Sequence, residues 1–207
     1  MSEFKEVVDG IYRLDVRFEA IYTSVFLVRT SSGFILVDTA TTDADVDECI
    51  VPALRKMGVA VSELEAVVLT HGHRDHAGGL PRIRALSPSV RVVREVTKLS
   101  DGLRTYALPG HTDDSIGVFD SRTGTLISGD GLQGAGVDKY RCNVRNREAY
   151  FEILKKIKED KKIKNIVFSH AYEPWNSDVV FGRSGVEMRI EDCRKCIEAV
   201  ILRESQR

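Results

Sequence analysis

A buried strand that runs directly into a cluster of histidines is the feature of this sequence that most constrains its fold. Residues 64–70 read Leu-Glu-Ala-Val-Val-Leu-Thr and predict the strand, and four potential metal ligands follow within six residues: His71, His73, Asp75 and His76. Residues i and i+2 of an extended chain point the same way, so His71 and His73 can hold one metal ion. Asp75 and His76 follow as the chain turns, and they can reach a second ion.

Four other segments place a potential ligand at or just after a predicted strand. They supply His111 in Pro-Gly-His-Thr, Asp130 in Ser-Gly-Asp, His170 in Phe-Ser-His and Asp38 in Val-Asp-Thr. All five histidines of the chain belong to this combined set. Nitrogen and oxygen ligands in this mixture suit Zn²⁺ best, with Fe or Mn as alternatives. Asp38 is expected to support the ligands as a hydrogen-bond acceptor and not to bind metal itself.

The periodicity of the rest of the chain favours an α/β layered fold. Strands are predicted in two groups with helices beside each, which disfavours an all-β barrel. The predicted strands are residues 11–16, 21–29, 34–38, 64–70, 90–96, 103–108, 116–120, 125–128 and 165–168, and the predicted helices are residues 44–57, 79–86, 146–161 and 186–202. A length of 207 residues predicts a single domain over residues 1–207.

Composition and charge narrow the class of partner. Apolar residues make up 43% of the chain and charged residues 29%, which is typical of a globular protein. The 30 basic and 31 acidic residues leave a net charge of −1, which argues against a nucleic-acid partner. No apolar run approaches the ~18–20 residues needed to cross a bilayer, and the N-terminus has no secretory pattern. We therefore expect a cytoplasmic protein with a small-molecule substrate and no membrane partner, and the oligomeric state stays open.

The ligand pattern resembles the metallo-β-lactamase superfamily. The resemblance rests on His-x-His-x-Asp-His at residues 71–76 and on the later ligands, and it covers the chain from Asp38 to His170. It implies a four-layer αβ/βα sandwich with the metal site at one edge. It also implies a division of ligands: His71, His73 and His111 on one metal, Asp75, His76 and His170 on the other, and Asp130 bridging. One departure is Ala40, since the family often has Asp-Thr-Gly where this chain has Asp-Thr-Ala.

The two expected ions predict a hydrolase of a small ester, thioester or lactone. A pair of metal ions lowers the pKa of water towards ~7, so that a bridging hydroxide can attack the substrate. Asp75 is expected both to bind metal and to accept a proton from the attacking water. A phosphodiesterase or nuclease on the same site is the alternative that the balanced charge disfavours. An iron-dependent sulfur dioxygenase with one iron, or a non-catalytic metal-binding module, is disfavoured by the complete set of ligands.

Aromatic and basic residues suggest where a substrate could bind. Lys139, Tyr140 and Arg141 lie in a loop that leaves Asp130, and they predict a wall for an anionic substrate. The Lys-Tyr pair is similar to the substrate-binding Lys and Tyr of hydroxyacylglutathione hydrolases (glyoxalase II). Trp175 and Tyr22 are predicted as further pocket walls.

The four cysteines are predicted to be reduced thiols, because they are sparse and no secretion signal precedes them. Cys193 and Cys196 lie in a predicted amphipathic helix and suit a packed core better than a redox pair. Cys142 lies in the loop after Asp130, and a redox role for these three residues stays open.

Overall fold

The computed structural model describes residues 2–18, 21–100, 102–135, 142–172 and 177–206 of the chain. The chain forms two compact units, residues 1–104 and residues 105–207. Four predicted substrate residues, Lys139, Tyr140, Arg141 and Trp175, lie outside the described residues, and their roles stay predictions.

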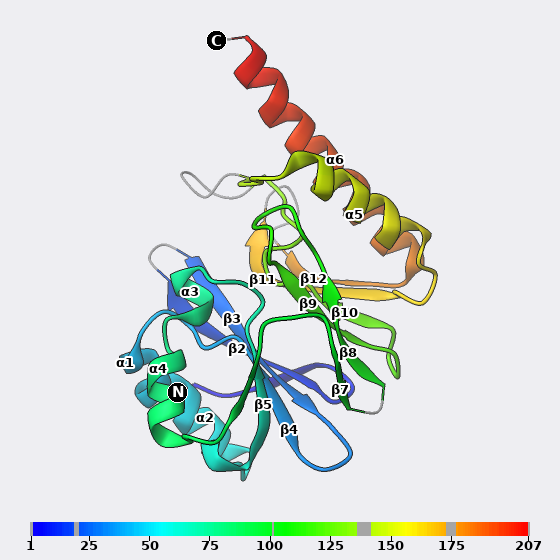
Figure 1. The fold of residues 1–207 in the computed structure, drawn as a ribbon. Helices are drawn as coiled ribbons and strands as arrows, with labels where there is room; N and C mark the ends of the chain where they lie inside the picture. Colours follow the sequence, from blue (N-terminus) through cyan, green and yellow to red (C-terminus); the bar gives the residue numbers. More distant parts are fainter. Residues whose placement is uncertain (1, 19–20, 101, 136–141, 173–176, 207) are drawn as a thin grey trace. The chain divides into compact units, whose positions relative to one another are not determined.

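The first unit is built on a six-stranded sheet in the order β1-β2-β3-β4-β5-β6 (Figure 1). The strands β1 to β4 pair antiparallel, whereas β4, β5 and β6 are parallel. Parallel neighbours end at the same edge, so the residues after β4 and after β5 come together there. The strands are β1 (Lys5–Val8), β2 (Ile11–Phe18), β3 (Ile21–Arg29), β4 (Phe34–Val37), β5 (Leu64–Val68) and β6 (Arg91–Val93).

The helix predicted over residues 44–57 is present but interrupted. It consists of α1 (Asp43–Asp45), a π-helical turn (Val46–Ile50) and α2 (Val51–Lys56). Pro52 has no N–H and cannot make the usual bond to the preceding turn, which explains the change of helical pitch ahead of it. Further helical segments are η2 (Val61–Glu63), α3 (Arg74–Ala77) and α4 (Leu80–Leu86).

The second six-stranded sheet has the order β12-β11-β10-β9-β8-β7. Its strands are β7 (Lys98–Ser100), β8 (Leu103–Ala107), β9 (Ile116–Asp120), β10 (Thr125–Ile127), β11 (Asn165–Tyr172) and β12 (Ser177–Phe181), and the boundary between the two units falls within β8. Strands β10 and β11 are parallel. The prediction that β11 ends at Phe168 is wrong, because the strand continues to Tyr172 and contains His170.

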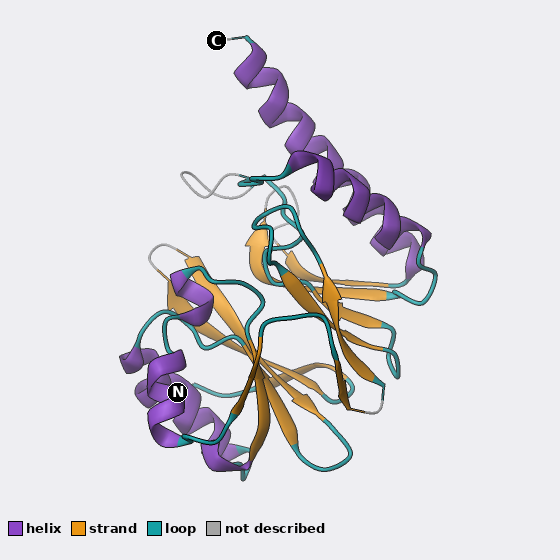
Figure 2. Ribbon diagram, viewed as in Figure 1, coloured by secondary structure: helices purple, strands orange, loops and turns teal. Residues whose placement is uncertain are grey.

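Two helices, α5 (Arg147–Glu159) and α6 (Arg183–Ser205), lie side by side in the second unit (Figure 2). Their apolar residues and those of the sheet form one core, in which Cys193 is buried as its place on the apolar stripe predicts. Burial raises the pKa of the Cys142 thiol to about 12 and also raises that of Cys193, so both stay protonated near neutral pH. None of the helices among the described residues meets the length and hydropathy needed to cross a membrane.

Candidate metal centre

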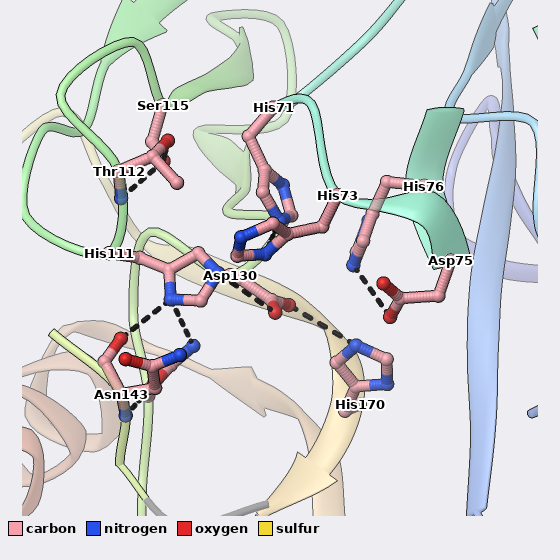
Figure 3. A network of polar contacts seen from close by, with 12 residues as sticks. His71, His73, Asp75, His76, His111, Thr112, Ser115, Asp130, Asn143 and His170 are labelled. Carbon is pink, nitrogen blue, oxygen red and sulfur yellow. Dashed lines mark hydrogen bonds and ion pairs between the residues drawn. The ribbon is translucent and has the colours of Figure 1, made fainter. Parts of the chain in front are cut away.

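The donor cluster of the first unit begins where β5 ends. His71 and His73 follow the strand on a segment that bends at Gly72, and the Nε2 atom of His71 lies 2.9 Å from Nδ1 of His73 (Figure 3). Two nitrogens that each lie ~2.0–2.1 Å from a tetrahedral zinc ion would be ~3.3 Å apart. The pair is therefore close to the spacing at which both imidazoles can ligate one ion.

A single buried carboxylate orients this cluster. Asp38 follows β4, and one of its oxygens, Oδ2, accepts hydrogen bonds from the Thr70 hydroxyl and from His76 Nδ1, both at 2.8 Å. Its other oxygen accepts the Thr70 N–H at 2.8 Å. Since the Thr70 hydroxyl proton points to Asp38, its oxygen is available to accept from His71 Nδ1 at 3.2 Å.

The tautomers of two imidazoles follow from these contacts. A proton on Nδ1 leaves the Nε2 lone pair of the same neutral ring available to a metal. Asp38 imposes this state on His76 directly and on His71 through Thr70. Asp38 is fully buried and has a φ of 64°, in the left-handed region that an aspartate tolerates better than most residues.

The short helix α3 brings Asp75 next to His76. The Nε2 atom of His76 lies 3.3 Å from Oδ2 of Asp75 (Figure 3). The backbone behind α3 is tightly packed: a Cβ on Gly78 would lie 1.9 Å from the carbonyl oxygen of Thr41. A glycine is required at this position, and it lets α3 hold its two donors close to the β4 edge.

The pairing of two strands brings Asp130 and His170 close together in the second unit. Strands β10 and β11 are parallel with Ile127 opposite Val167, so Asp130 and His170, each three residues after that pair, lie at the same end of the two strands. The Asp130 oxygens lie 3.3 Å from Nε2 of His170 and 3.6 Å from Nε2 of His111 (Figure 3). One carboxylate thus presents each of its oxygens to a different imidazole, which is an arrangement that can contact two ions.

The loop that carries His111 is fixed by Gly110. The carbonyl oxygen of Gly110 accepts hydrogen bonds from the N–H groups of Arg145 and Asn146, at 2.8 and 2.9 Å. Its φ is 147°, and a Cβ there would lie 2.7 Å from the ring of Tyr150. Both observations require glycine at residue 110 and explain why His111 follows a Pro-Gly pair.

Several residues around the donors were not predicted from the sequence. Tyr172 donates its hydroxyl proton to Oδ1 of Asp130 at 3.1 Å, and its position two residues after His170 on one strand was an available signal. Thr70 carried a similar signal, because it directly precedes His71. Gln133 and Asn143, which both contact His111, had no such signal because their proximity depends on the path of a loop.

Tyr22, a predicted pocket wall, is placed by the structure at the start of β3. It is half-buried, and its ring centre lies 6.0 Å from the Arg13 guanidinium carbon. These contacts give no test of a role in substrate binding, so the role stays a prediction.

Comparison with known proteins agrees with the donor pattern. Residues 19–100 match the family model described as Metallo-beta-lactamase superfamily. The lactamase-like protein adaB of Aspergillus niger is 28% identical over 156 residues, which cover 66% of this chain and 48% of that protein. The hydroxyacylglutathione hydrolase of Legionella pneumophila (strain Corby) is 27% identical over 143 residues, which cover 56% of each. The chain thus spans about half the length of the curated relatives it matches.

Solved structures share the fold. The crystal structure of DIM-1 metallo-beta-lactamase aligns with a TM-score of 0.73 and 15% identity, and the alignment covers 94% of this chain and 97% of that one. A likeness at this level of identity establishes the fold alone. The α/β sandwich that the sequence predicted is confirmed.

Proposed function

We propose that the chain is a member of the metallo-β-lactamase superfamily, whose family model matches residues 19–100, and that it is a metal-dependent hydrolase of a small ester, thioester or lactone. The observation that carries the proposal is the orientation of the imidazoles. His71 and His76 hold their Nδ1 atoms against oxygen acceptors and keep Nε2 for a metal. Histidines that ligate a metal usually donate their other ring N–H to a carboxylate or another oxygen acceptor, and these contacts follow that pattern.

We propose a dinuclear site with the division of ligands that the resemblance to the superfamily implies. In this assignment one ion is held by His71, His73 and His111, the other by Asp75, His76 and His170, and Asp130 bridges them. The chemistry of the donors supports the assignment, because imidazole nitrogens and carboxylate oxygens in these numbers suit zinc. The two oxygens of Asp130, each near a different imidazole, support its role as the bridge.

Different residues of the chain are proposed to take different roles in hydrolysis. Divalent metal ions supply Lewis acidity and lower the pKa of water to ~7. Asp75 is proposed to accept a proton at a carboxylate oxygen, since its side chain lies beside the proposed ligand His76 and a carboxylate can act as a general base. Asp38 and Thr70 keep the imidazoles in the ligating tautomer and so preserve the site between turnovers.

A thioester is the substrate class that we favour within this group. The support is the relative named hydroxyacylglutathione hydrolase, whose substrate by that name is a thiol ester of glutathione. Lys139, Tyr140 and Arg141 are proposed to contact the anionic part of such a substrate, with Trp175 and Tyr22 as apolar walls.

The test is a substrate panel with purified protein loaded with zinc. We expect turnover of acyl thioesters or lactones, loss of turnover after chelation, and recovery when zinc is restored. Phosphodiester hydrolysis without ester hydrolysis would favour the nuclease alternative. Ester hydrolysis that survives both complete chelation and the variant His71→Ala would contradict a metal-dependent mechanism.

A further inference from the structure

Gln133 lies in the loop after Asp130 and is almost fully buried, at 3% exposure. Its side-chain oxygen accepts the backbone N–H of Asn143 at 2.8 Å, and its amide nitrogen lies 3.0 Å from Nδ1 of His111. Its own backbone N–H donates to the Tyr150 hydroxyl at 3.0 Å, so the residue is anchored to the buried face of α5. Gln133 therefore contacts Tyr150 of α5, the backbone of Asn143 and the proposed metal ligand His111.

The backbone carbonyl of Asn143 determines where the His111 proton sits. This carbonyl oxygen lies 2.6 Å from His111 Nδ1 and can only accept a hydrogen bond, so Nδ1 must carry the proton. The Nε2 atom of the neutral ring then keeps its lone pair on the side where Asp130 Oδ2 lies at 3.6 Å. The Gln133 amide nitrogen lies 3.0 Å from the same Nδ1 and could donate to it only in the other tautomer, which would leave the closer Asn143 carbonyl facing a lone pair.

We propose that Gln133 is a positioning residue for metal binding: it holds the Asn143 carbonyl in place, and that carbonyl holds His111 in the ligating tautomer. The inference rests on the proposed function, since it concerns a ligand of the proposed site. An imidazole with its proton on Nε2 cannot ligate through that atom, and loss of such a supporting contact typically costs ~10–100-fold in metal affinity. Glutamine supplies the acceptor for the Asn143 N–H in a partly buried contact, and an apolar residue could not.

Two variants of similar size separate the polar role of Gln133 from its packing. Gln133→Met removes the acceptor for Asn143 and nearly preserves the side-chain volume. Gln133→Glu preserves an acceptor oxygen at the same place. Asn165→Leu is the matched control, because Asn165 also hydrogen-bonds to the backbone within the second unit, through its contact with the Thr123 carbonyl at 3.1 Å.

The first readout is the imidazole ¹⁵N spectrum of the metal-free protein above the ordinary histidine pKa of ~6.5. We expect wild type, Gln133→Glu and Asn165→Leu to hold His111 with its proton on Nδ1, and Gln133→Met to show a mixture of tautomers. The second readout is Co²⁺ affinity, for which Gln133→Met should be weaker by ~10–100-fold and Gln133→Glu close to wild type.

The outcomes distinguish this inference from the proposed function. A wild-type His111 with its proton on Nε2 would overturn the inference without any variant. So would a Gln133→Met protein that is less stable to heat, yet keeps both the Nδ1 tautomer and wild-type Co²⁺ affinity, because that result assigns Gln133 to packing alone. A wild-type protein that binds no metal would overturn the proposed function, while the tautomer spectra would still decide the role of Gln133.

Discussion

Asp130→Ala is expected to reduce hydrolysis more than any other single substitution of an acidic residue, and to leave the protein unable to retain a metal pair. The variant loses the carboxylate whose two oxygens lie near His111 and His170. Without that negative charge, two cations at ~3.5–4 Å would repel each other across the site. The measurements are kcat/KM and metal content after loading.

Two other aspartates supply the comparison. Asp38→Ala removes the acceptor that orients His71 and His76 but no metal ligand, and we expect a loss of ~10–100-fold. Asp120→Ala removes a buried carboxylate of the second unit that pairs with Arg122, and should leave the metal content unchanged. If Asp38→Ala proves more damaging than Asp130→Ala, the division between metal ligand and supporting residue is wrong.

Asp75→Asn is expected to retain part of its metal but to lose ~10²–10⁴-fold in kcat. Asparagine preserves the shape of the side chain and one ligating oxygen. It cannot accept a proton from the attacking water, which is the role proposed for Asp75. The measurement is kcat at saturating metal and substrate, with metal content determined on the same sample.

A matched variant identifies the cause of that loss. Asp75→Glu preserves a carboxylate, and some of its activity should survive even if its geometry is imperfect. Near-normal kcat in fully loaded Asp75→Asn would remove the proton-transfer role and leave Asp75 as a ligand only.

The donors of the first unit could be predicted from the sequence because their geometry is local. His71 and His73 are separated only by Gly72, so their closeness in the sequence keeps their rings close together although the backbone bends between them. The donors of the second unit come from three distant segments, and their proximity depends on the parallel pairing of β10 with β11. The residue types and the ends of predicted strands indicated these donors. The strand pairing that brings Asp130 near His170 cannot be predicted from any short segment of the sequence.

Supporting residues were harder to predict than ligands. Gln133 and Asn143 are ordinary polar residues in a loop, and nothing in their neighbours distinguishes them from solvated ones. Their proposed function depends on a contact between positions ten apart in the sequence, in which the Gln133 side chain accepts the Asn143 N–H. Hydrogen bonds between a side chain and a distant backbone group are decided by tertiary structure and leave little trace in the sequence periodicity.

Elements of the fold that depend on local sequence were also easier to predict than elements that depend on tertiary pairing. Helix α5 spans Arg147–Glu159 against a prediction of residues 146–161, because its apolar residues repeat at helical spacing. The strands β1, β7 and β12 were not predicted, and all three lie at the ends of sheets where pairing on one side sustains a short segment. The extension of β11 was missed because Ser169 and His170 are polar, although both are buried.

The central claim is that this chain holds two metal ions, and the metal-to-protein ratio of carefully loaded protein tests it most directly. The account predicts about two ions per chain for the wild type and about one for His170→Ala, since that variant lacks a ligand of only one of the ions. A wild-type ratio of about one ion per chain that His170→Ala leaves unchanged would contradict it.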